Sequence, residues 1–363
     1  MTEQAQAPHI FLTGGGTLGH VMPNLPLIDY YLAEGWQVSY IGSKTGPERA
    51  ALAQIKGVTY HPVRTGKLRR YFDFQNFLDL FNVSIAVIQC FLLFRKHKPT
   101  VLFSKGGYVA LPPVVAARLA KVPSVIHESD KSPGLTTNLS KRFAQKICVA
   151  FQDTARYFEP QKVVYTGLPV RNLVFEANKS RGLELIGFDG NRPILLVFGG
   201  SLGAGFLNKL TRENIQNGNL DAYDVVNICG KGNLDTQINQ ANYQQFESLG
   251  NDFLHIMQAA DIVLTRGGAT SLFELLAMQK PHIIIPLSKK ASRGDQIENA
   301  QYFASLGVST YLEEENYTWT KLAVLLDQTS FNWNTTLLQI QKLAFDQATQ
   351  KVITVINEVA TQK

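Results

Sequence analysis

Short apolar runs alternate along this chain with longer segments in which apolar residues recur every three or four positions. A short apolar run that ends in glycine or polar residues indicates a buried parallel strand, and the longer period indicates a helix. The pattern predicts strands over residues 9–13, 38–41, 100–104, 123–130, 225–230, 260–265 and 283–285, and one that begins at residue 193. It predicts helices over residues 23–33, 112–120, 272–278, 321–327 and 335–359. Strands that alternate with helices indicate the α/β class.

One local pattern occurs in both halves of the chain. Gly-Gly-Thr-Leu-Gly at 15–19 and Gly-Gly-Ser-Leu-Gly at 199–203 each follow a predicted strand. With 363 residues, the chain is too long for one typical domain and suits two. We therefore expect two doubly wound, Rossmann-like domains that face a cleft, over residues 1–167 and 168–344. We expect a C-terminal helix, at about residues 345–363, to pack back on the first domain.

The first glycine turn predicts a site for phosphate. Gly14, Gly16 and Gly19 have the G-x-G-x-x-G spacing, which lets backbone N–H groups approach a diphosphate closely. A dinucleotide-binding domain would also carry an acidic residue at the end of its second strand, where this chain has Gly-Ser-Lys at 42–44. A P-loop would need a lysine after the last glycine, where this chain has His20. The turn therefore favours a phosphate cradle that belongs to neither nucleotide motif.

Titratable residues follow the predicted strands at the edge where parallel sheets bind ligands. His20 comes directly after the first glycine turn, so it is a candidate base or hydrogen-bond donor to an anion, with a structural role equally open. Glu128 and Asp130 end the strand at 123–130 and are candidate carboxylates. His127, beside them, is also compatible with a structural role.

The second half carries its own candidate phosphate site. Arg266-Gly267-Gly268 predicts a tight turn after the strand at 260–265. Thr270 or Ser271 then caps or begins the helix at 272–278. A helix N-terminus with free N–H groups and a glycine approach suits a phosphate.

Polar side chains near that turn suit a nucleotide sugar. Glu274 lies one turn into the helix, and its carboxylate can accept two hydrogen bonds from a ribose diol. Gln296 and Asn299 are three residues apart, so they share one helix face and can contact sugar hydroxyls. The alternative is an ordinary strand–turn–helix with polar surface residues.

Composition narrows the class of protein. Hydrophobic residues make up 45% of the chain and charged residues 18%, which is typical of a globular protein with large cores. The net charge of +6 suits an anionic substrate or membrane surface but is too weak to indicate nucleic acid. The three cysteines are widely spaced and predict neither a metal site nor a disulfide framework. We see no signal peptide, and the most apolar window, 83–94, is too short to span a bilayer.

The segment 68–81 mixes aromatic and basic residues. Its apolar positions fall on one helical face, at Tyr71, Phe74, Phe77, Leu78 and Phe81. Such a face fits either a core helix or an interfacial patch. In the second case Lys67, Arg69 and Arg70 would meet anionic lipid headgroups.

Seven short motifs lie in order along nearly the whole chain. They are GGGTLGHVMP at 14–23, KGGYVALP at 105–112, HESD at 127–130, TGLPVR at 166–171, FGGSLGA at 198–204, RGGATSLFE at 266–274 and SRGDQ at 292–296. Together they resemble the MurG family, the peptidoglycan glycosyltransferases of GT-B fold. The SRGDQ form is similar to the Gram-positive branch of that family.

The resemblance implies a reaction and a place for it. N-acetylglucosamine (GlcNAc) would be transferred from UDP-GlcNAc to the 4-hydroxyl of the muramyl sugar of lipid I, with inversion at the anomeric carbon, to give lipid II. The enzyme would serve cell-wall synthesis, and through it cell shape and division, as a peripheral protein on the cytoplasmic side of the cell membrane. Its partners would be UDP-GlcNAc, lipid I, an anionic membrane surface and other cell-wall proteins, without nucleic acid.

The resemblance also assigns the donor site to the second domain. Ser201 would hold phosphate, and Ala269, Thr270 and Ser271 would present backbone N–H groups to the donor phosphates. Glu274 would take the ribose, and Gln296 and Asn299 the GlcNAc hydroxyls. Backbone near Gly250 would hold the uracil. Arg171, in the segment between the domains, would also contact the donor.

In the first domain, Thr17, Leu18, Gly19 and Tyr108 would face the cleft and the acceptor diphosphate. A 4-hydroxyl is a weak nucleophile and needs a base. His20 is the first candidate, with Glu128 or Asp130 as rivals. No Asp-x-Asp pair occurs in the chain, so we expect no essential metal and no cofactor.

Two positions depart from the family pattern. Leu18 stands where glycine is frequent, and Asp130 where asparagine is usual. A carboxylate near phosphates would repel them unless it is protonated or paired. The alternatives are another GT-B transferase with a different glycolipid acceptor, a UDP-GlcNAc epimerase, or a binding protein without turnover; a dehydrogenase is disfavoured by the missing acid.

Overall fold

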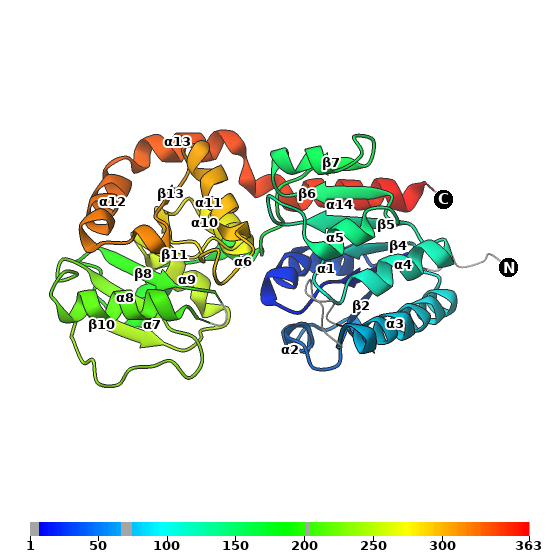
Figure 1. The fold of residues 1–363 in the computed structure, drawn as a ribbon, viewed down its shortest axis with the longest axis horizontal. Coiled ribbons are helices and arrows are strands. Elements are labelled where there is room, and N and C mark those ends of the chain that lie inside the picture. The colour runs from blue at the N-terminus through cyan, green and yellow to red at the C-terminus, as the bar shows by residue number, and fades with distance from the viewer. Residues whose placement is uncertain (1–6, 67–74, 201–202, 363) are drawn as a thin grey trace. The chain divides into compact units, whose positions relative to one another are not determined.

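The computed structural model describes residues 7–66, 75–200 and 203–362. The chain divides into two compact units (Figure 1). The first comprises Met1–Arg171 and Asp346–Lys363, and the second comprises Asn172–Phe345. The sequence pattern placed the boundary at residue 167, between the last strand of the first unit and this division.

Within the described residues, the first unit is built on a seven-stranded parallel sheet of order β3-β2-β1-β4-β5-β6-β7. Its strands are β1 (His9–Thr13), β2 (Gln37–Ser43), β3 (Val58–Val63), β4 (Val101–Ser104), β5 (Ser124–Glu128), β6 (Lys146–Val149) and β7 (Val163–Tyr165). Its α-helices are α1 (Leu25–Ala33), α2 (Pro47–Leu52), α3 (Gln75–His97), α4 (Leu111–Ala120), α5 (Leu135–Ser140) and α14 (Ala348–Thr361). Short 3₁₀ helices occur at Leu18–His20, Met22–Asn24 and Gln152–Tyr157.

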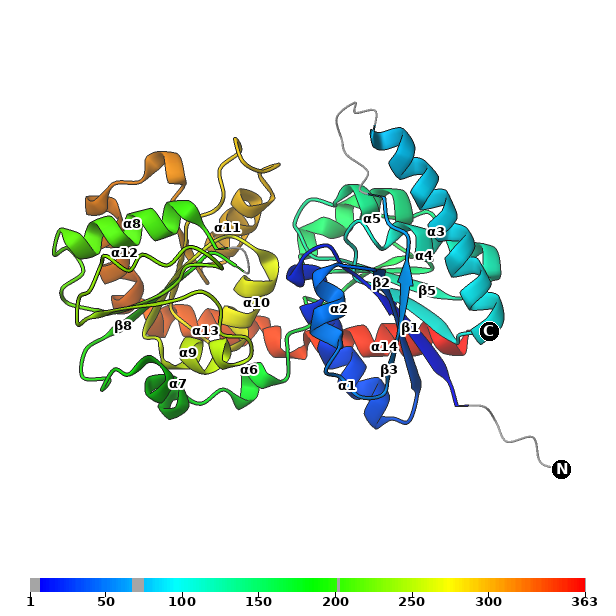
Figure 2. The same cartoon turned by 90° about the horizontal axis from the view of Figure 1, so that it is seen from below.

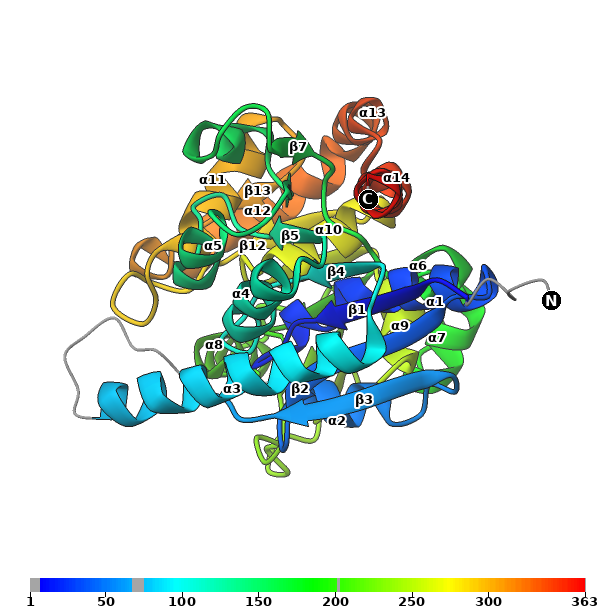
Figure 3. The same cartoon turned by 90° about the vertical axis from the view of Figure 1, so that its right-hand side faces the viewer.

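Helices cover both faces of this sheet, as Figure 3 shows with α14 and α3 on opposite sides. Alternate residues of β1 explain the layers, since successive side chains of a strand point to opposite faces. Ile10 and Leu12 pack with α1 and α14, whereas Phe11 packs with α3 and α4. Strands buried on both faces read as continuous apolar runs, which is why β1, β4 and β5 were found from the sequence.

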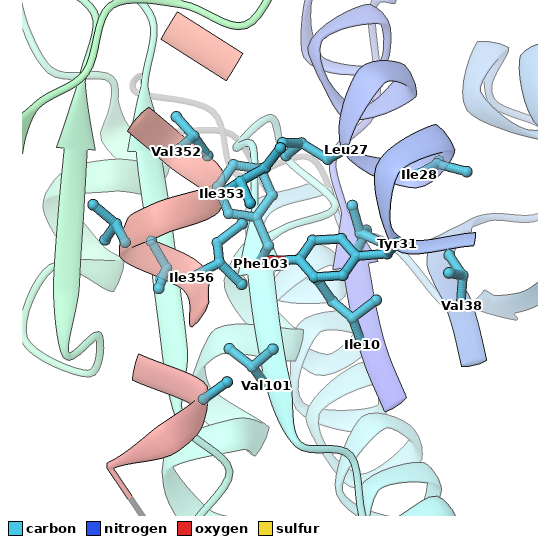
Figure 4. Packing of buried hydrophobic residues seen from close by; sticks show 14 of the residues in the cluster. Ile10, Leu27, Ile28, Tyr31, Val38, Val101, Phe103, Val352, Ile353 and Ile356 are labelled. Carbon is cyan, nitrogen blue, oxygen red and sulfur yellow. The ribbon is translucent and has the colours of Figure 1, made fainter. Parts of the chain in front are cut away.

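The last helix of the chain belongs to the first unit. Val352, Ile353 and Ile356 of α14 are buried against Val101 and Phe103 of β4 (Figure 4). Burial of such side chains stabilises the unit by roughly 1.5–3 kcal/mol each. The pattern at 335–359 is divided by Ala344 (φ 47°) into α13 (Trp333–Leu343) and α14.

Within the described residues, the second unit is built on a six-stranded parallel sheet of order β10-β9-β8-β11-β12-β13. Its strands are β8 (Ile194–Phe198), β9 (Asp224–Ile228), β10 (Tyr243–Phe246), β11 (Ile262–Thr265), β12 (His282–Ile284) and β13 (Thr310–Tyr311). Its remaining helices are α6 (Leu173–Glu176), α7 (Lys179–Ile186), α8 (Gly205–Gln216), α9 (Asp252–Ala259), α10 (Ala269–Ala277), α11 (Asp295–Ser305) and α12 (Trp319–Phe331). Two 3₁₀ turns lie at Glu314–Asn316 and Phe345–Gln347, the latter where the units join.

The helices of the second unit also lie on both faces of its sheet. Leu207 and Leu210 of α8 pack on Leu195 and Val197 of β8, whereas Phe253 of α9 meets the ring of Phe198 edge-on. Figure 2 shows α8 and α9 on the two sides of these strands.

Two of the helix starts that differ from the sequence prediction follow glycine turns. The helix predicted at 23–33 begins at Leu25, because a 3₁₀ turn at Met22–Asn24 precedes it. The helix predicted at 272–278 begins at Ala269, because Gly268 takes the N-cap position with φ −71° and ψ 125°. Thr270 and Ser271 therefore lie inside the first turn of α10 and do not cap it.

The long helix α3 contains the apolar window 83–94. Among the described residues, no helix combines the length and the apolar character that crossing a membrane requires. Tyr71, Phe74 and the basic residues Lys67, Arg69 and Arg70 lie outside the described residues, as do the side chains of Phe77 and Leu78. Phe81 is described, and its side chain is 63% exposed, so at this position the predicted face is not core.

Candidate active site

A cavity of about 190 Å³ opens in the first unit at the carboxyl ends of β4 and β5. Four residues that were separate candidates in the sequence line this cavity, namely His20, Tyr108, Glu128 and Asp130. Its other lining residues include Lys105, Gly106, Gly107, His127, Gly134, Thr136 and Thr137. The edge of a parallel sheet where its strands end is where such folds bind ligands.

His20 ends the 3₁₀ turn Leu18–His20 and is half-buried at the cavity wall. The two glycines after Lys105 make room for its ring. A Cβ atom on Gly107 would lie 3.0 Å from His20 Cδ2 and would overlap the carbonyl oxygen of Gly15, and Gly107 also has φ +81°. Only glycine fits this close approach without strain. The imidazole is thus held at the cavity by the KGGY motif.

Thr17 is exposed, and Leu18 and Gly19 are half-buried in the same turn. Tyr108 lies against this loop, since a Cβ on Gly16 would meet its Cε1 atom. The first glycine turn and the KGGY turn therefore pack together, and the backbone N–H of Gly15 donates to Gly106 O at 3.3 Å.

Two backbone N–H groups of the first glycine turn have partners inside the first unit. Gly15 N–H donates to Gly106 O, and Gly16 N–H donates to Glu48 Oε2 at 3.3 Å. These two N–H groups thus serve the unit itself, and the phosphate cradle stays a prediction. Moreover, α1 begins only at Leu25, so no α-helix N-terminus follows the turn directly in the part of the chain that the structure describes.

Glu128 organises the loop beyond β5. Its Oε1 accepts hydrogen bonds from the N–H groups of Ser129 (2.8 Å) and Asp130 (3.0 Å), and its Oε2 accepts from Gly134 N–H (2.9 Å). The side chain is buried. Burial, with the nearby negative charge of Asp130, raises the pKa of Glu128. A carboxylate with both oxygens engaged is better suited to hold this loop than to accept a proton from a substrate.

His127 has a structural contact. Its ring is buried, and Nε2 lies 2.9 Å from Gly167 O, so Nε2 donates because a carbonyl only accepts. Burial, and then the positive charge of Lys105, lower the pKa of His127. The neutral ring therefore joins β5 to the segment that leaves the first unit. This contact agrees with the structural role that the sequence left open for His127.

Lys105 is a cavity residue to which the sequence analysis gave no role. Its side chain is 1% exposed, and Nζ donates to the hydroxyl of Ser129. Burial lowers the pKa of Lys105 to about 8, against the opposing effect of the Glu128 and Asp130 carboxylates. The sequence indicated a role for Lys105 only by its position, directly after a buried strand whose neighbouring strand ends in two acidic residues. Because lysine is almost always solvated, the sequence alone gave no reason to expect a buried lysine here.

In the second unit, the turn between β11 and α10 is held by polar side chains. Gln296 Oε1 accepts from Gly267 N–H (3.2 Å) and from Leu287 N–H (3.0 Å). Asn299 Nδ2 donates to Gly267 O at 3.1 Å, and this side chain is fully buried. Both predicted sugar-contacting residues thus face the turn. Asn299 supports it from inside the unit, and Gln296 stays partly exposed.

An ion pair fixes the same turn from the other side. Arg266 Nη2 lies 2.6 Å from Glu314 Oε1, and both side chains are mostly buried. Arg266 Nη1 donates to Ile285 O at 3.1 Å, and Glu314 Oε2 accepts from Ser288 N–H at 3.3 Å. The guanidinium therefore joins the turn to the loop after β12. Neither of these two side chains was singled out as a contact from the sequence, because residue 314 lies 48 positions after 266.

The remaining donor candidates lie at several places along the chain. Ala269 is buried, and Thr270 and Ser271 are half-buried in the first turn of α10. Glu274 lies one turn on and is buried. Gly250 is exposed before α9, with φ +54°, and Arg171 is half-buried at the end of its unit. Ser201 lies outside the described residues.

The whole chain matches known glycosyltransferases. Residues 10–149 match the glycosyltransferase family 28 N-terminal domain, and residues 194–354 match the glycosyltransferase family 28 C-terminal domain. The chain is 43% identical over 358 residues to the UDP-N-acetylglucosamine--N-acetylmuramyl-(pentapeptide) pyrophosphoryl-undecaprenol N-acetylglucosamine transferase of Clostridium tetani, covering 98% of this chain and 99% of that protein. The chain belongs to the MurG family of glycosyltransferases.

Two further similarities agree with MurG membership. The transferase of the same name from Geobacillus kaustophilus is 44% identical over 352 residues, which is 97% of this chain and 98% of that protein. The crystal structure of Acinetobacter baumannii MurG has a TM-score of 0.74 at 23% identity, over 97% of this chain and 99% of that one. The family resemblance and the class of two Rossmann-like α/β units are thereby confirmed, and the dehydrogenase alternative has no support.

Proposed function

We propose that this MurG-family chain transfers GlcNAc from UDP-GlcNAc to the muramyl sugar of a pyrophosphoryl-undecaprenol acceptor, lipid I, and so makes lipid II. The observation that carries this proposal is identity above 40% over nearly the whole length to transferases named for that donor and acceptor. The reaction serves peptidoglycan and cell-wall synthesis.

His20 is the base that we assign to the acceptor 4-hydroxyl. It is half-buried at the wall of the cavity in the first unit, where a bound hydroxyl can reach it. Glu128 is the weaker candidate because its oxygens accept three backbone N–H groups. Attack by the 4-hydroxyl on the anomeric carbon, from the side opposite to UDP, inverts that carbon and moves the hydroxyl proton to the imidazole.

The donor lies at the turn between β11 and α10 in this proposal. Ala269, Thr270 and Ser271 form the first turn of α10, where backbone N–H groups point toward the helix N-terminus. Together with the helix dipole, they stabilise the negative charge that grows on the leaving diphosphate. Glu274 takes the ribose, and Gln296 offers its Nε2 group to the sugar while Oε1 holds Gly267.

No metal or cofactor takes part in the proposed reaction. Many transferases of another architecture clamp the donor diphosphate through an Asp-x-Asp pair, which this chain lacks. The helix N-terminus supplies the positive electrostatic potential in its place.

One experiment tests these assignments together. UDP release from UDP-GlcNAc is measured with and without a lipid I analogue, in excess EDTA. Release that needs the analogue and persists in EDTA supports a metal-independent transferase, and release without acceptor would indicate hydrolysis or an epimerase instead. His20→Ala should lower kcat by about 10²–10⁴ while UDP-GlcNAc binding persists. Glu128→Gln should retain far more activity, and the reverse order would identify Glu128 as the base.

We further propose that the chain binds an anionic membrane surface through α3 and α4, as a peripheral protein. Phe81, Ile88 and Leu92 are 63%, 59% and 61% exposed, and their spacing places them along one side of α3. Leu119 of α4, which packs against α3, is 61% exposed. Exposed basic residues flank these positions, at Arg95, Lys96, Arg118 and Lys121. An apolar face edged by cations fits an anionic bilayer that holds a lipid-linked substrate.

Vesicle sedimentation tests this membrane face. The triple variant Phe81→Ser, Ile88→Ser, Leu92→Ser should bind vesicles of anionic lipid more weakly but keep its activity on a short-chain, water-soluble acceptor. Leu338→Ser is the matched control, because Leu338 is 59% exposed in the second unit. Equal binding by the triple variant and the control would refute the proposed face. We propose the cytoplasmic side of the membrane for this contact, as the family resemblance implies.

A further inference from the structure

Lys105 is the most unusual side chain of the cavity. Lysine is almost never fully buried unless it is paired, yet Lys105 is 1% exposed. Its backbone is fixed, because its N–H donates to Thr13 O of β1 at 2.8 Å. Its side chain reaches from the end of β4 to the end of β5, where Nζ donates to the Ser129 hydroxyl. The protein therefore places one ammonium group at the base of this cavity.

Two carboxylates share that environment. Glu128 and Asp130 flank Ser129, line the same cavity and interact electrostatically with Lys105. Glu128 is buried and holds the loop, whereas Asp130 is half-buried. Without Lys105, two like charges would lie together beside any ligand of the cavity. Like charges in one site destabilise each other and repel an anion.

The acceptor of the proposed reaction is such an anion, because it carries a pyrophosphoryl group. We propose that Lys105 is a positioning residue for the acceptor. Its ammonium holds Ser129 and balances the Glu128 and Asp130 carboxylates, so that this cavity accepts a diphosphate-bearing acceptor although Asp130 is acidic. This inference rests on the proposed function and adds a residue to it.

The charge balance distinguishes this role from simple packing. The other titratable groups at the cavity are His20, Tyr108 and His127, and His127 is held neutral by burial. Lys105 is thus a buried cation of the cavity that interacts with both carboxylates. If Lys105 only filled space, then a neutral side chain of similar length would replace it. If it balances charge, then Lys105→Met weakens acceptor binding, and removing one of the two carboxylates restores that binding.

The test compares KM values of the full-length enzyme for a lipid I analogue and for UDP-GlcNAc. Lys105→Met should raise the acceptor KM by at least about tenfold and leave the donor KM within about twofold, since an unbalanced charge acts on the nearby anion. Asp130→Asn, which keeps the shape of the side chain, should lower the acceptor KM. The double variant Lys105→Met, Asp130→Asn should recover most of the acceptor affinity lost in Lys105→Met.

Lys280→Met is the matched control. Lys280 is another lysine whose pKa burial lowers to about 8, and its Nζ donates to Gln258 O and Ala260 O in the second unit. Its loss should reduce the melting temperature but leave the acceptor KM unchanged.

Three results would overturn the role of Lys105. The first is an acceptor KM of the double variant as high as that of Lys105→Met. The second is an equal change of the acceptor and donor KM values in Lys105→Met. The third is an increase of the acceptor KM in Asp130→Asn. The last measurement decides the matter even if Lys105→Met does not fold. A wild-type enzyme without acceptor-dependent UDP release would remove the proposed function itself, and the acceptor role of Lys105 with it.

Discussion

Glu48 of α2 accepts the backbone N–H of Gly16 through Oε2 at 3.3 Å, so a carboxylate lies directly beneath the first glycine turn. The same group accepts the N–H of Ser43 at 2.8 Å and its hydroxyl at 2.5 Å through Oε1. Glu48 is fully buried. It therefore ties the end of β2 to the glycine turn, and fixes the loop that carries Thr17, Leu18 and His20.

We predict that Glu48→Ala destabilises the first unit by about 2–4 kcal/mol, because each buried N–H left without an acceptor costs about 1–3 kcal/mol. His20 should lose its fixed position as well, so kcat should fall while the UDP-GlcNAc affinity of the second unit stays unchanged. Hydrogen exchange of peptides from β1 and β2 measures the local stability, and UDP release measures kcat.

Glu34→Ala is the control for that variant, since Glu34 is exposed at the end of α1 and its loss should cost less than about 0.5 kcal/mol. Equal protection of β1 and β2 in Glu48→Ala and Glu34→Ala would show that the carboxylate does not hold the glycine turn.

A second prediction concerns pH and three histidines on one side of the same sheet. His9 Nε2 and His61 Nε2 lie 2.9 Å and 3.2 Å from Ser39 Oγ, and the rings of His9 and His61 both approach that of His97. Burial, followed by the charges of His97 and His61, lowers the pKa of His9 from 6.5 to about 4. Burial, followed by His97 and Lys96, also lowers the pKa of His61.

A lowered pKa means that the folded unit binds fewer protons than the unfolded chain. For His9, the stabilisation is complete above pH 6.5 and is lost as the pH falls toward 4. We therefore expect the denaturation midpoint of the first unit to decrease through this window. His9→Gln removes one titrating group and should make the decrease shallower. An unchanged slope in that variant would mean that other groups cause the acid sensitivity.

The sequence predicted the central strands of both sheets, apart from β6, but not the strands at the edges. Strands β1, β4, β8 and β11 are buried on both faces, so their apolar runs are continuous. The strands β3, β10 and β13 lie at sheet edges and carry exposed or half-buried positions, which leave no clear run. An edge strand has a neighbour on one side only, and its side chains need not be apolar.

Site residues could be predicted where a local motif determines the backbone conformation. They could not be predicted where the contact joins residues far apart in the sequence. The glycine turns and the strand ends located His20, Glu128 and Asp130, which the structure brings to one cavity. Lys105 and Glu48 were not identified, because a charged residue in one sequence shows neither its burial nor its partner. Glu48 in particular supplies an acid beneath the glycine turn that the end of β2 seemed to lack.

A third prediction concerns the buried ion pair of Arg266 and Glu314. Glu314→Ala leaves the guanidinium in place without its carboxylate, and breaking a buried pair in this way costs about 3–5 kcal/mol. The loop after β12 would lose its link to the turn before α10. We expect a lower unfolding midpoint of the second unit and a higher KM for UDP-GlcNAc. Glu184→Ala removes an exposed carboxylate 3.2 Å from Arg181 and should cost less than about 1 kcal/mol.

Both effects should be absent from the first unit, so the acceptor KM serves as the internal reference. If Glu314→Ala and Glu184→Ala behave alike, then the ion pair does not support the donor turn.

A fourth prediction separates two adjacent glycines of that turn. A Cβ on Gly267 would overlap the carbonyl oxygen of Gln296 and approach its Cβ to 2.9 Å, whereas a Cβ on Gly268 meets nothing within 4 Å among the described residues. Gly267→Ala must therefore push α11 away and break the bonds of Gln296 and Asn299 to the turn. We expect it to weaken UDP-GlcNAc binding by about tenfold or more, as overpacking costs typically 1–3 kcal/mol. Gly268→Ala should keep binding within about threefold, and isothermal titration with UDP-GlcNAc compares the two. Similar affinities for both variants would show that the contact between the turn and α11 does not shape the donor site.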